Sequence, residues 1–230
     1  MAEEGPDYVA IITDGNGRWA SRRGLDVGEG HRAGAETVRA RLRDAVELGI
    51  RELTIYAWST ENWDRARAEV EGLMGLMAEY IDNVTPELHA EGVQLRFIGR
   101  RGEPVPGRVI ERMEWAEELT AGNQRITFFI PFNYGGRAEI LDAARSFSGG
   151  SEEDFRMRLY APDMHDPELL IRTGDERRLS NYLLWQLAYT ELVFREEMWP
   201  EFSRRSFESA IEEFRRRRKR PGQAGTPPEP

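Results

Sequence analysis

The chain has 230 residues, of which 40% are hydrophobic and 10% aromatic, a composition that suits one globular domain with a substantial core. Its formal net charge of −9 excludes the broad basic face that non-specific nucleic-acid binding needs, so no nucleic-acid partner is expected. The chain has no cysteine and three histidines, which excludes disulfides and thiolate metal sites and disfavours zinc.

The distribution of charge narrows the expected location and chemistry further. The first six residues are acidic and polar, and no later stretch approaches the ~18 apolar residues that a membrane-spanning helix needs. We therefore expect a protein that is cytoplasmic or peripheral at the inner face of the membrane. Only Lys219 is lysine among 32 basic residues, so arginines must perform most anion recognition, through their planar bidentate guanidinium groups.

Six short apolar runs predict β-strands. Several are continuous rather than alternating, as strands covered on both faces require. In chain order they are residues 8–13, 53–58, 93–98, 126–131, 169–172 and 192–195.

Helical patterns lie between these strands. Val38, Leu42 and Val46 form one apolar stripe, and Gly49 then has the character of a helix C-cap. Further helices are expected over residues 69–90, 109–121, 136–147, 153–160, 181–189 and 206–218. Alternating strands and helices predict an α/β domain with a mainly parallel sheet, whose ligands bind beyond the carboxyl ends of the strands.

A glycine-containing acidic segment follows the first expected strand. Gly15 and Gly17 let the backbone bend and present amide groups to an anion, while Arg18 offers a bidentate phosphate contact. Asp14 is a hard oxygen ligand, and a carboxylate beside a diphosphate makes sense where magnesium bridges the two. A plain Asx turn also explains this spacing. A dinucleotide fingerprint ending at Ala20 is disfavoured, because no acidic residue ends a second strand ~20 residues later.

A second glycine-rich segment, residues 28–34, surrounds the expected start of the next helix. The free amide groups and the positive dipole end of a helix favour phosphate there. His31 lies in this segment and could donate to a leaving group. A lone histidine is more often structural, so the interpretation rests on its position.

Six blocks in order resemble the cis-prenyltransferase family typified by undecaprenyl diphosphate synthase, and the resemblance spans roughly residues 8–202. The blocks are DGNGRWA at 14–20, GHRAG at 30–34, AWSTENWDR at 57–65, NYGGR at 133–137, IRTG at 171–174 and RLSNYLLWQ at 178–186, followed by Glu191.

The resemblance implies a magnesium-dependent homodimeric enzyme. It would condense isopentenyl diphosphate with an allylic prenyl diphosphate into a medium- or long-chain polyprenyl diphosphate, such as an undecaprenyl cell-wall lipid carrier. The implied fold is a single α/β domain, with a six-stranded parallel sheet wrapped by about seven helices around a hydrophobic tunnel. Residues 1–214 would form this catalytic domain, and residues 215–230 a basic helix end and flexible tail.

The resemblance also assigns roles residue by residue. Magnesium would be held by Asp14 and Glu191. The allylic diphosphate would contact Gly15, Asn16, Gly17, Arg18, Trp19, His31 and Arg65. The reacting carbons would be bordered by Ser59, Asn62 and Trp63, and Thr60 and Glu61 would be further substrate-binding residues. The isopentenyl diphosphate would be held by Arg172, Arg178, Ser180 and Arg220, the last reaching across the dimer. Catalytic roles fall to Asp14, Asn62 and His31, and the proton acceptor stays open between Asp14, His31 and a diphosphate oxygen.

Departures from the family pattern keep alternatives open. Val27 stands where many members have a diphosphate-binding arginine, so a short-chain or irregular isoprenyl diphosphate synthase is one alternative. Ala57 is small where the family uses a small residue for long products, which favours chains well beyond one condensation. A non-catalytic partner subunit is a second alternative, although such subunits typically lose the aspartate and phosphate-loop residues. A trans-prenyltransferase is excluded, since the chain has no Asp-Asp-x-x-Asp motif.

The C-terminal residues allow three interpretations. Arg220, Pro221 and Gly222 resemble an Arg-x-Gly element that crosses the family's dimer interface. The basic run before them could instead contact anionic lipid peripherally, at about 1 kcal/mol per residue. A solvated, disordered tail is the third interpretation.

Overall fold

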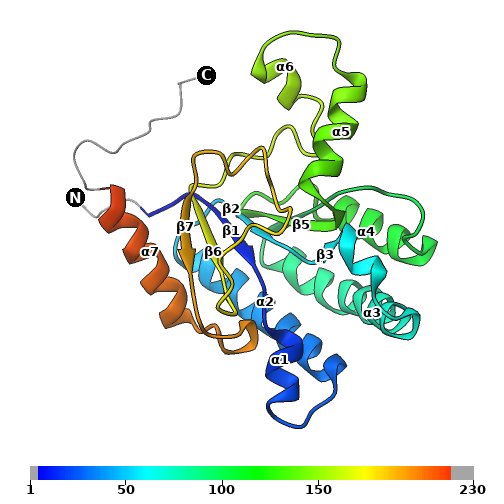
Figure 1. Ribbon diagram of the computed structural model, residues 1–230, viewed down its shortest axis with the longest axis vertical. Coiled ribbons are helices and arrows are strands. Elements are labelled where there is room, and N and C mark those ends of the chain that lie inside the picture. The colour runs from blue at the N-terminus through cyan, green and yellow to red at the C-terminus, as the bar shows by residue number, and fades with distance from the viewer. Residues whose placement is uncertain (1–4, 219–230) are drawn as a thin grey trace. The chain divides into compact units, whose positions relative to one another are not determined.

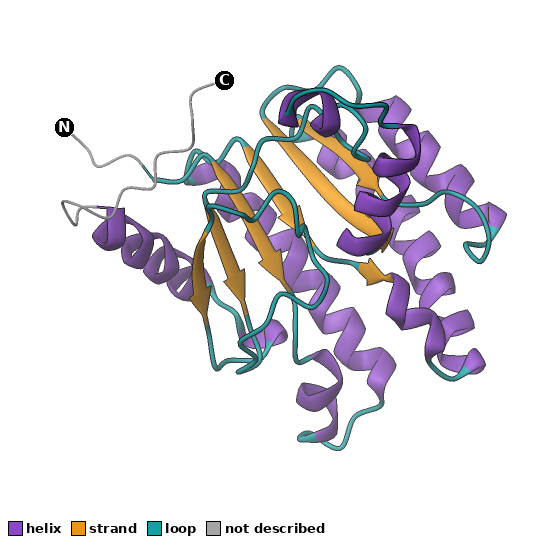
Figure 2. Ribbon diagram, turned by 45° about the horizontal axis from the view of Figure 1, so that its top comes forward, coloured by secondary structure: helices purple, strands orange, loops and turns teal. Residues whose placement is uncertain are grey.

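The computed structural model describes residues 5–218 (Figures 1 and 2). These residues divide into two compact units. The first unit contains the described residues up to Leu53, together with Asp166–Arg178 and those from Gln186 onward. The second unit contains Thr54–His165 and Leu179–Trp185. In the described part of the chain, no helix is both long and apolar enough to cross a membrane.

Three parallel strands form the centre of the first unit, with β6 between the other two (Figure 1). They are β1 (Tyr8–Ile12), β6 (Leu169–Arg172) and β7 (Glu191–Phe194). The apolar runs of β1 and β6 are continuous because these two strands are covered on both faces, and Ile11 and Ile171 have no exposed surface. The register places Ile12 opposite Arg172, so the chain segments after β1 and β6 leave the sheet together.

Three helices belong to the first unit. They are α1 (Asn16–Ser21), α2 (Val27–Glu47) and α7 (Arg204–Arg218), with the short 3-10 helix η2 (Trp199–Glu201) before α7. The predicted apolar face of the last helix is confirmed: Phe207, Ile211 and Phe214 are buried. The predicted glycine cap is confirmed as well, since Gly49 has φ +79° and Ile50 N–H donates to Ala45 at 3.0 Å.

The second unit has its own parallel strands, with β5 between β3 and β4. The strands are β3 (Trp58–Ser59), β4 (Val93–Ile98) and β5 (Ile126–Tyr134). Its helices are η1 (Thr60–Asp64), α3 (Arg67–Ala90), α4 (Gly107–Thr120), α5 (Gly136–Ser146) and α6 (Glu152–Arg156). Helix α4 packs on β4 and against α3 (Figure 1).

The predicted α/β class with parallel strands is confirmed, but the described residues contain seven strands rather than six. The single strand expected over residues 53–58 is divided into β2 (Glu52–Ile55) and the two-residue β3. The described residues form seven α-helices, the number expected, although one predicted helix is absent and α1 was not predicted. The domain division at residue 214 stays a prediction, because residues 219–230 lie outside the described residues.

The helix predicted over residues 181–189 is wrong. This segment forms turns, and Ser180, Asn181 and Leu183 have φ values of 48°, 63° and 42°. Those angles lie in the left-handed region, which a right-handed helix cannot contain. The apolar residues of the segment are buried without helical periodicity, as Tyr182 and Leu183 illustrate.

Candidate functional site

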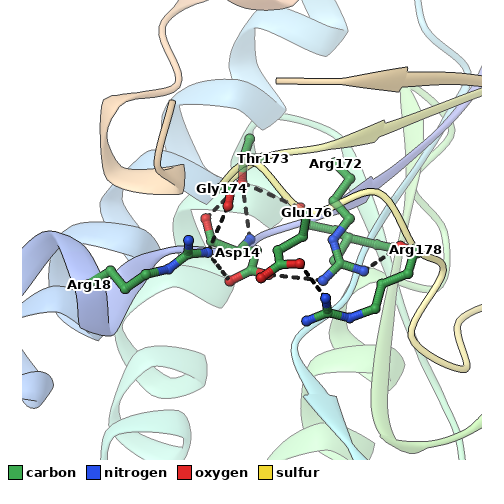
Figure 3. A network of polar contacts seen from close by, with 8 residues as sticks. Asp14, Arg18, Arg172, Thr173, Gly174, Glu176 and Arg178 are labelled. Carbon is green, nitrogen blue, oxygen red and sulfur yellow. Dashed lines mark hydrogen bonds and ion pairs between the residues drawn. The ribbon is translucent and has the colours of Figure 1, made fainter. Parts of the chain in front are cut away.

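Asp14 lies where β1 and β6 end, within the first unit (Figure 3). Thr173 follows β6 directly, and its hydroxyl fixes the backbone of Asp14 on both sides. The Thr173 Oγ1 accepts from Asp14 N–H at 3.0 Å and donates to the Asp14 carbonyl at 2.9 Å. The rule that ligands bind beyond the carboxyl ends of parallel strands thus points to Asp14. The same rule would have identified Thr173, which the sequence analysis missed.

Two arginines share the Asp14 carboxylate. Arg172 Nη2 lies 2.9 Å from Oδ2, and Arg18 Nη2 lies 3.1 Å from Oδ1. The Arg172 side chain is only 3% exposed, whereas that of Arg18 is 46% exposed and also donates to the Gly174 carbonyl at 2.8 Å. One carboxylate therefore faces two guanidinium groups, which leaves local positive charge in a chain whose net charge is −9.

Arg178 belongs to the same network (Figure 3). Arg172 Nη1 donates to the Arg178 carbonyl, and the Arg178 guanidinium pairs with Glu176. One network within this unit thus contains four of the predicted site residues, Asp14, Arg18, Arg172 and Arg178. Glu176 was not predicted as part of it.

The bend after Asp14 requires glycine at one position. Gly15 has φ +110° at the start of α1, and a Cβ there would lie 2.9 Å from the Cβ of Met198. Trp199 N–H donates to the Asp14 carbonyl at 2.9 Å, so the segment before α7 stabilises the bend. Gly17 lies inside α1, and a Cβ there would meet no protein atom within 4 Å.

The second glycine-rich segment differs from the prediction. Helix α2 begins at Val27, so Gly30, His31 and Gly34 lie inside the helix rather than around its start. Its N-terminus is closed by the Asp26 carboxylate, which accepts from Glu29 N–H at 2.9 Å. A phosphate at this N-terminus would meet two acidic side chains, so the anion site predicted there is not supported. His31 is half-buried on α2.

Glu191 lies at the opposite end of the strands from Asp14. It begins β7 opposite Leu169, the first residue of β6, whereas Asp14 lies beyond the carboxyl end of β1. Three strand residues separate it from the carboxyl edge by roughly 10 Å. Its carboxylate pairs with Arg217 of α7 at 3.1 Å. The structure therefore does not bring Glu191 to Asp14 within one chain, and the apolar run after Glu191 was a sign of this.

The second unit groups other predicted residues around η1. Ser59 N–H donates to Asn62 Oδ1 at 2.9 Å, which fixes Asn62 at the first turn. Trp63 Nε1 donates to Asn133 Oδ1 at 2.8 Å, and its ring meets that of Trp58 edge-on at 5.2 Å.

Arg65 follows η1 and pairs with Glu69 at 3.0 Å. Its guanidinium also lies 5.8 Å from the centre of the Trp58 ring.

Asn181 connects η1 to the start of α5 and was missed as a site residue. Its Nδ2 donates to Glu61 Oε1 at 2.7 Å, and its Oδ1 accepts from Arg137 N–H at 2.8 Å. Burial alone would raise the pKa of Glu61, but hydrogen bonds from Asn181, Ser59 and Thr60 hold that pKa below its usual value. The left-handed backbone at Ser180 and Asn181 makes these contacts possible.

Metal-ligating side chains are sparse. Across residues 5–218, no group of three or more His, Cys, Asp or Glu side chains is placed to hold a metal ion. A lone, partly exposed carboxylate such as Asp14 still fits magnesium, which usually keeps waters and binds through one or two carboxylates plus substrate phosphates. Arg220, predicted to bind isopentenyl diphosphate, lies outside the described residues.

Comparison with known proteins places this geometry in one family. The family model described as "Putative undecaprenyl diphosphate synthase" matches residues 12–222. An isoprenyl transferase from Thermotoga maritima is 47% identical over 226 residues, covering 94% of this chain and 97% of the relative. A trans,polycis-polyprenyl diphosphate synthase ((2Z,6E)-farnesyl diphosphate specific) from Thermobifida fusca is 45% identical, covering 98% and 83%.

Two solved structures have the same fold. Lavandulyl diphosphate synthase from Lavandula x intermedia, in complex with dimethylallyl diphosphate, is 33% identical with a TM-score of 0.88, covering 92% of this chain and 95% of that one. A probable undecaprenyl diphosphate synthase from Campylobacter jejuni is 28% identical with a TM-score of 0.78, covering 94% and 97%. The chain therefore belongs to the undecaprenyl diphosphate synthase family, and it is an enzyme that transfers prenyl groups.

Proposed function

We propose that the protein is a magnesium-dependent cis-prenyltransferase that condenses isopentenyl diphosphate with an allylic diphosphate and releases a medium- or long-chain polyprenyl diphosphate. The observation that carries this proposal is the Asp14 carboxylate between Arg18 and Arg172, at the carboxyl ends of β1 and β6. A diphosphate offers the guanidinium groups more negative charge than one carboxylate does, and it offers pairs of oxygens that a planar guanidinium can bind in a bidentate manner.

The residues of the first unit would act on the departing diphosphate. As the allylic C–O bond breaks, negative charge grows on the diphosphate oxygens, and fixed cationic donors stabilise that charge. Arg18 is free to turn toward a ligand because nearly half of its side chain is exposed, whereas Arg172 is held by the Arg178 carbonyl. Gly17 leaves open space in which a phosphate could approach the backbone.

Magnesium, when bound at Asp14, would neutralise diphosphate charge and assist its departure. Arg172 and Arg178 would hold isopentenyl diphosphate, with Ser180 and Arg220 assigned to the same substrate by the family resemblance. Asn62, Ser59 and Trp63 are proposed to border the reacting carbons. The role proposed for Glu191 requires a site other than that of Asp14 in its own chain.

A shorter or irregular product is the second candidate. It is favoured by the similarity to lavandulyl diphosphate synthase and by Val27, which is 45% exposed at the start of α2 and offers no charge. Against it stands the family pattern, in which a small residue at the position of Ala57 goes with medium or long products. Chain length therefore separates the two candidates.

The experiment incubates purified protein with isopentenyl diphosphate and allylic primers of several lengths, with magnesium or with EDTA. Products are dephosphorylated and resolved by chromatography. The proposal expects magnesium-dependent products several condensations long. A protein that forms no product with any primer would refute the proposed condensation of isopentenyl diphosphate with an allylic diphosphate. A protein that stops after one condensation would favour the second candidate.

We also propose that the enzyme is a homodimer. Leu141 on α5 is 60% exposed and Met157, just after α6, is 57% exposed. Contact with a second copy would remove this apolar surface from water.

A further inference from the structure

Two glycines of α2 lie directly against the first residue of α1. Gly30 and Gly34 are four positions apart, so they lie on one face of the helix, and both are buried. A Cβ at Gly30 would lie 2.3 Å from the Asn16 carbonyl oxygen. A Cβ at Gly34 would lie 2.5 Å from Asn16 Oδ1. Both distances are below the 3.0 Å that real Cβ atoms keep, so any larger residue must displace Asn16.

Neither glycine is needed by the backbone, because both lie inside a regular helix. A glycine in a helix interior costs roughly 0.5–1 kcal/mol relative to alanine. Clearance for Asn16 therefore explains why α2 contains both.

The Asn16 side chain is itself unusual. Its Oδ1 is buried and has no hydrogen-bond partner among the described residues, a state that costs about 1–3 kcal/mol. The same turn of α2 is tied to the support of Asp14: Trp199 Nε1 donates to the Gly34 carbonyl at 2.8 Å, while Trp199 N–H donates to the Asp14 carbonyl at 2.9 Å. Gly34 thus contacts Asn16 directly and Asp14 through one residue.

We propose that Gly34 and Gly30 are positioning residues for diphosphate binding. By leaving room for Asn16, they hold this residue beside Asp14 in the position that diphosphate binding requires. The inference rests on the proposed function, because it assumes that an allylic diphosphate binds at residues 14–18. The two glycines act on different atoms: Gly34 limits the side chain of Asn16, and Gly30 limits its backbone.

This difference gives a rescue experiment. Gly34→Ala should weaken binding of inorganic diphosphate, measured by calorimetry with magnesium, and raise KM for the allylic substrate by about tenfold to hundredfold, as displacements of about 1 Å do. KM for isopentenyl diphosphate should change little. In an Asn16→Ala background the clashing Oδ1 is gone, so Gly34→Ala should cause no further loss. Gly30→Ala meets the backbone carbonyl, so its defect should persist in that background.

Gly72→Ala is the matched control. Gly72 is exposed on α3, and a Cβ there meets nothing within 4 Å, so binding should equal that of the wild type. Should Gly34→Ala alone fail to fold, the double variant with Asn16→Ala should fold, as circular dichroism would detect. Equal losses from Gly34→Ala with and without Asn16 would overturn the inference. Wild-type protein that binds no diphosphate would instead overturn the proposed function, on which the inference rests.

Discussion

Asp14→Asn removes the negative charge that Arg18 and Arg172 share while nearly keeping the shape of the side chain. The exposed pair with Arg18 contributes at most about 1 kcal/mol to stability. The hydrogen bond from the buried Arg172 is charge-assisted and contributes about 1.5–3 kcal/mol, of which an amide keeps part. We therefore expect the free energy of unfolding to fall by about 2 kcal/mol, which lowers Tm by about 4–8 °C.

The effects on binding and turnover should have opposite signs. Without metal, the two guanidinium groups no longer face a competing carboxylate, so inorganic diphosphate should bind about tenfold more tightly, equivalent to about 1.4 kcal/mol. With magnesium, turnover should fall by about 10²-fold or more, because a ligand of the charge-stabilising ion is lost.

Thermal denaturation, metal-free calorimetry and steady-state kinetics measure the three quantities separately. Arg23→Gln, which removes an exposed ion pair with Glu201, is the control for a lost surface charge. Near-normal turnover with unchanged Tm would refute the role derived for Asp14.

Other predictions address chain length, acid stability and assembly. Ala57→Leu should shorten the products, because the larger side chain narrows the space for the growing chain. Chromatography of the products measures their length, and unchanged lengths would contradict this prediction. The Arg100 guanidinium holds the pKa of Asp142 below its ordinary value of 3.8, so this carboxylate stabilises the fold above that value and loses its contribution as pH falls further. Asp142→Asn should therefore flatten the fall of Tm below about pH 4, and an unchanged acid limb would contradict the linkage. Leu141→Glu together with Met157→Glu should shift the protein toward monomer in light scattering, whereas an undisturbed dimer would show that its interface lies elsewhere.

The strands could be predicted from sequence because their apolar runs are continuous or alternating. β4 and β6 begin and end at the predicted residues: β6 is a continuous apolar run buried on both faces, whereas the apolar residues of β4 alternate with Gln94 and Arg96 before Ile98. The short helix α1 could not be predicted from an apolar pattern, because it begins with Asn16 and Gly17, residue types that are common in turns. Residues 181–189 have apolar residues at helix-like spacing, yet Asn181 and Leu183 have left-handed angles, and Asn181 contacts Glu61 and Arg137, which are distant in the sequence.

In the candidate site, too, residues next to recognisable strands could be predicted, whereas features that depend on tertiary contacts could not. Asp14 was found because it follows a recognisable strand, and Arg172, which was assigned by resemblance, ends the parallel strand beside it. Glu191 was grouped with them by resemblance alone, although its place before an apolar run puts it at the amino end. The space that Gly30 and Gly34 leave for Asn16 could not be predicted, because it depends on the packing of α1 against α2.

The hydrogen bonds between Asp14 and Thr173 have a consequence for the order of events during synthesis. The two residues are 159 positions apart, and Trp199, which supports the same bend, emerges later still. At about 5–20 residues per second, a ribosome needs roughly 8–30 seconds between making Asp14 and making Thr173. During that interval β1 lacks the neighbour that covers one of its edges, and contacts of such long range form slowly. The nascent chain must therefore keep an apolar strand from aggregating well before it can bind any diphosphate.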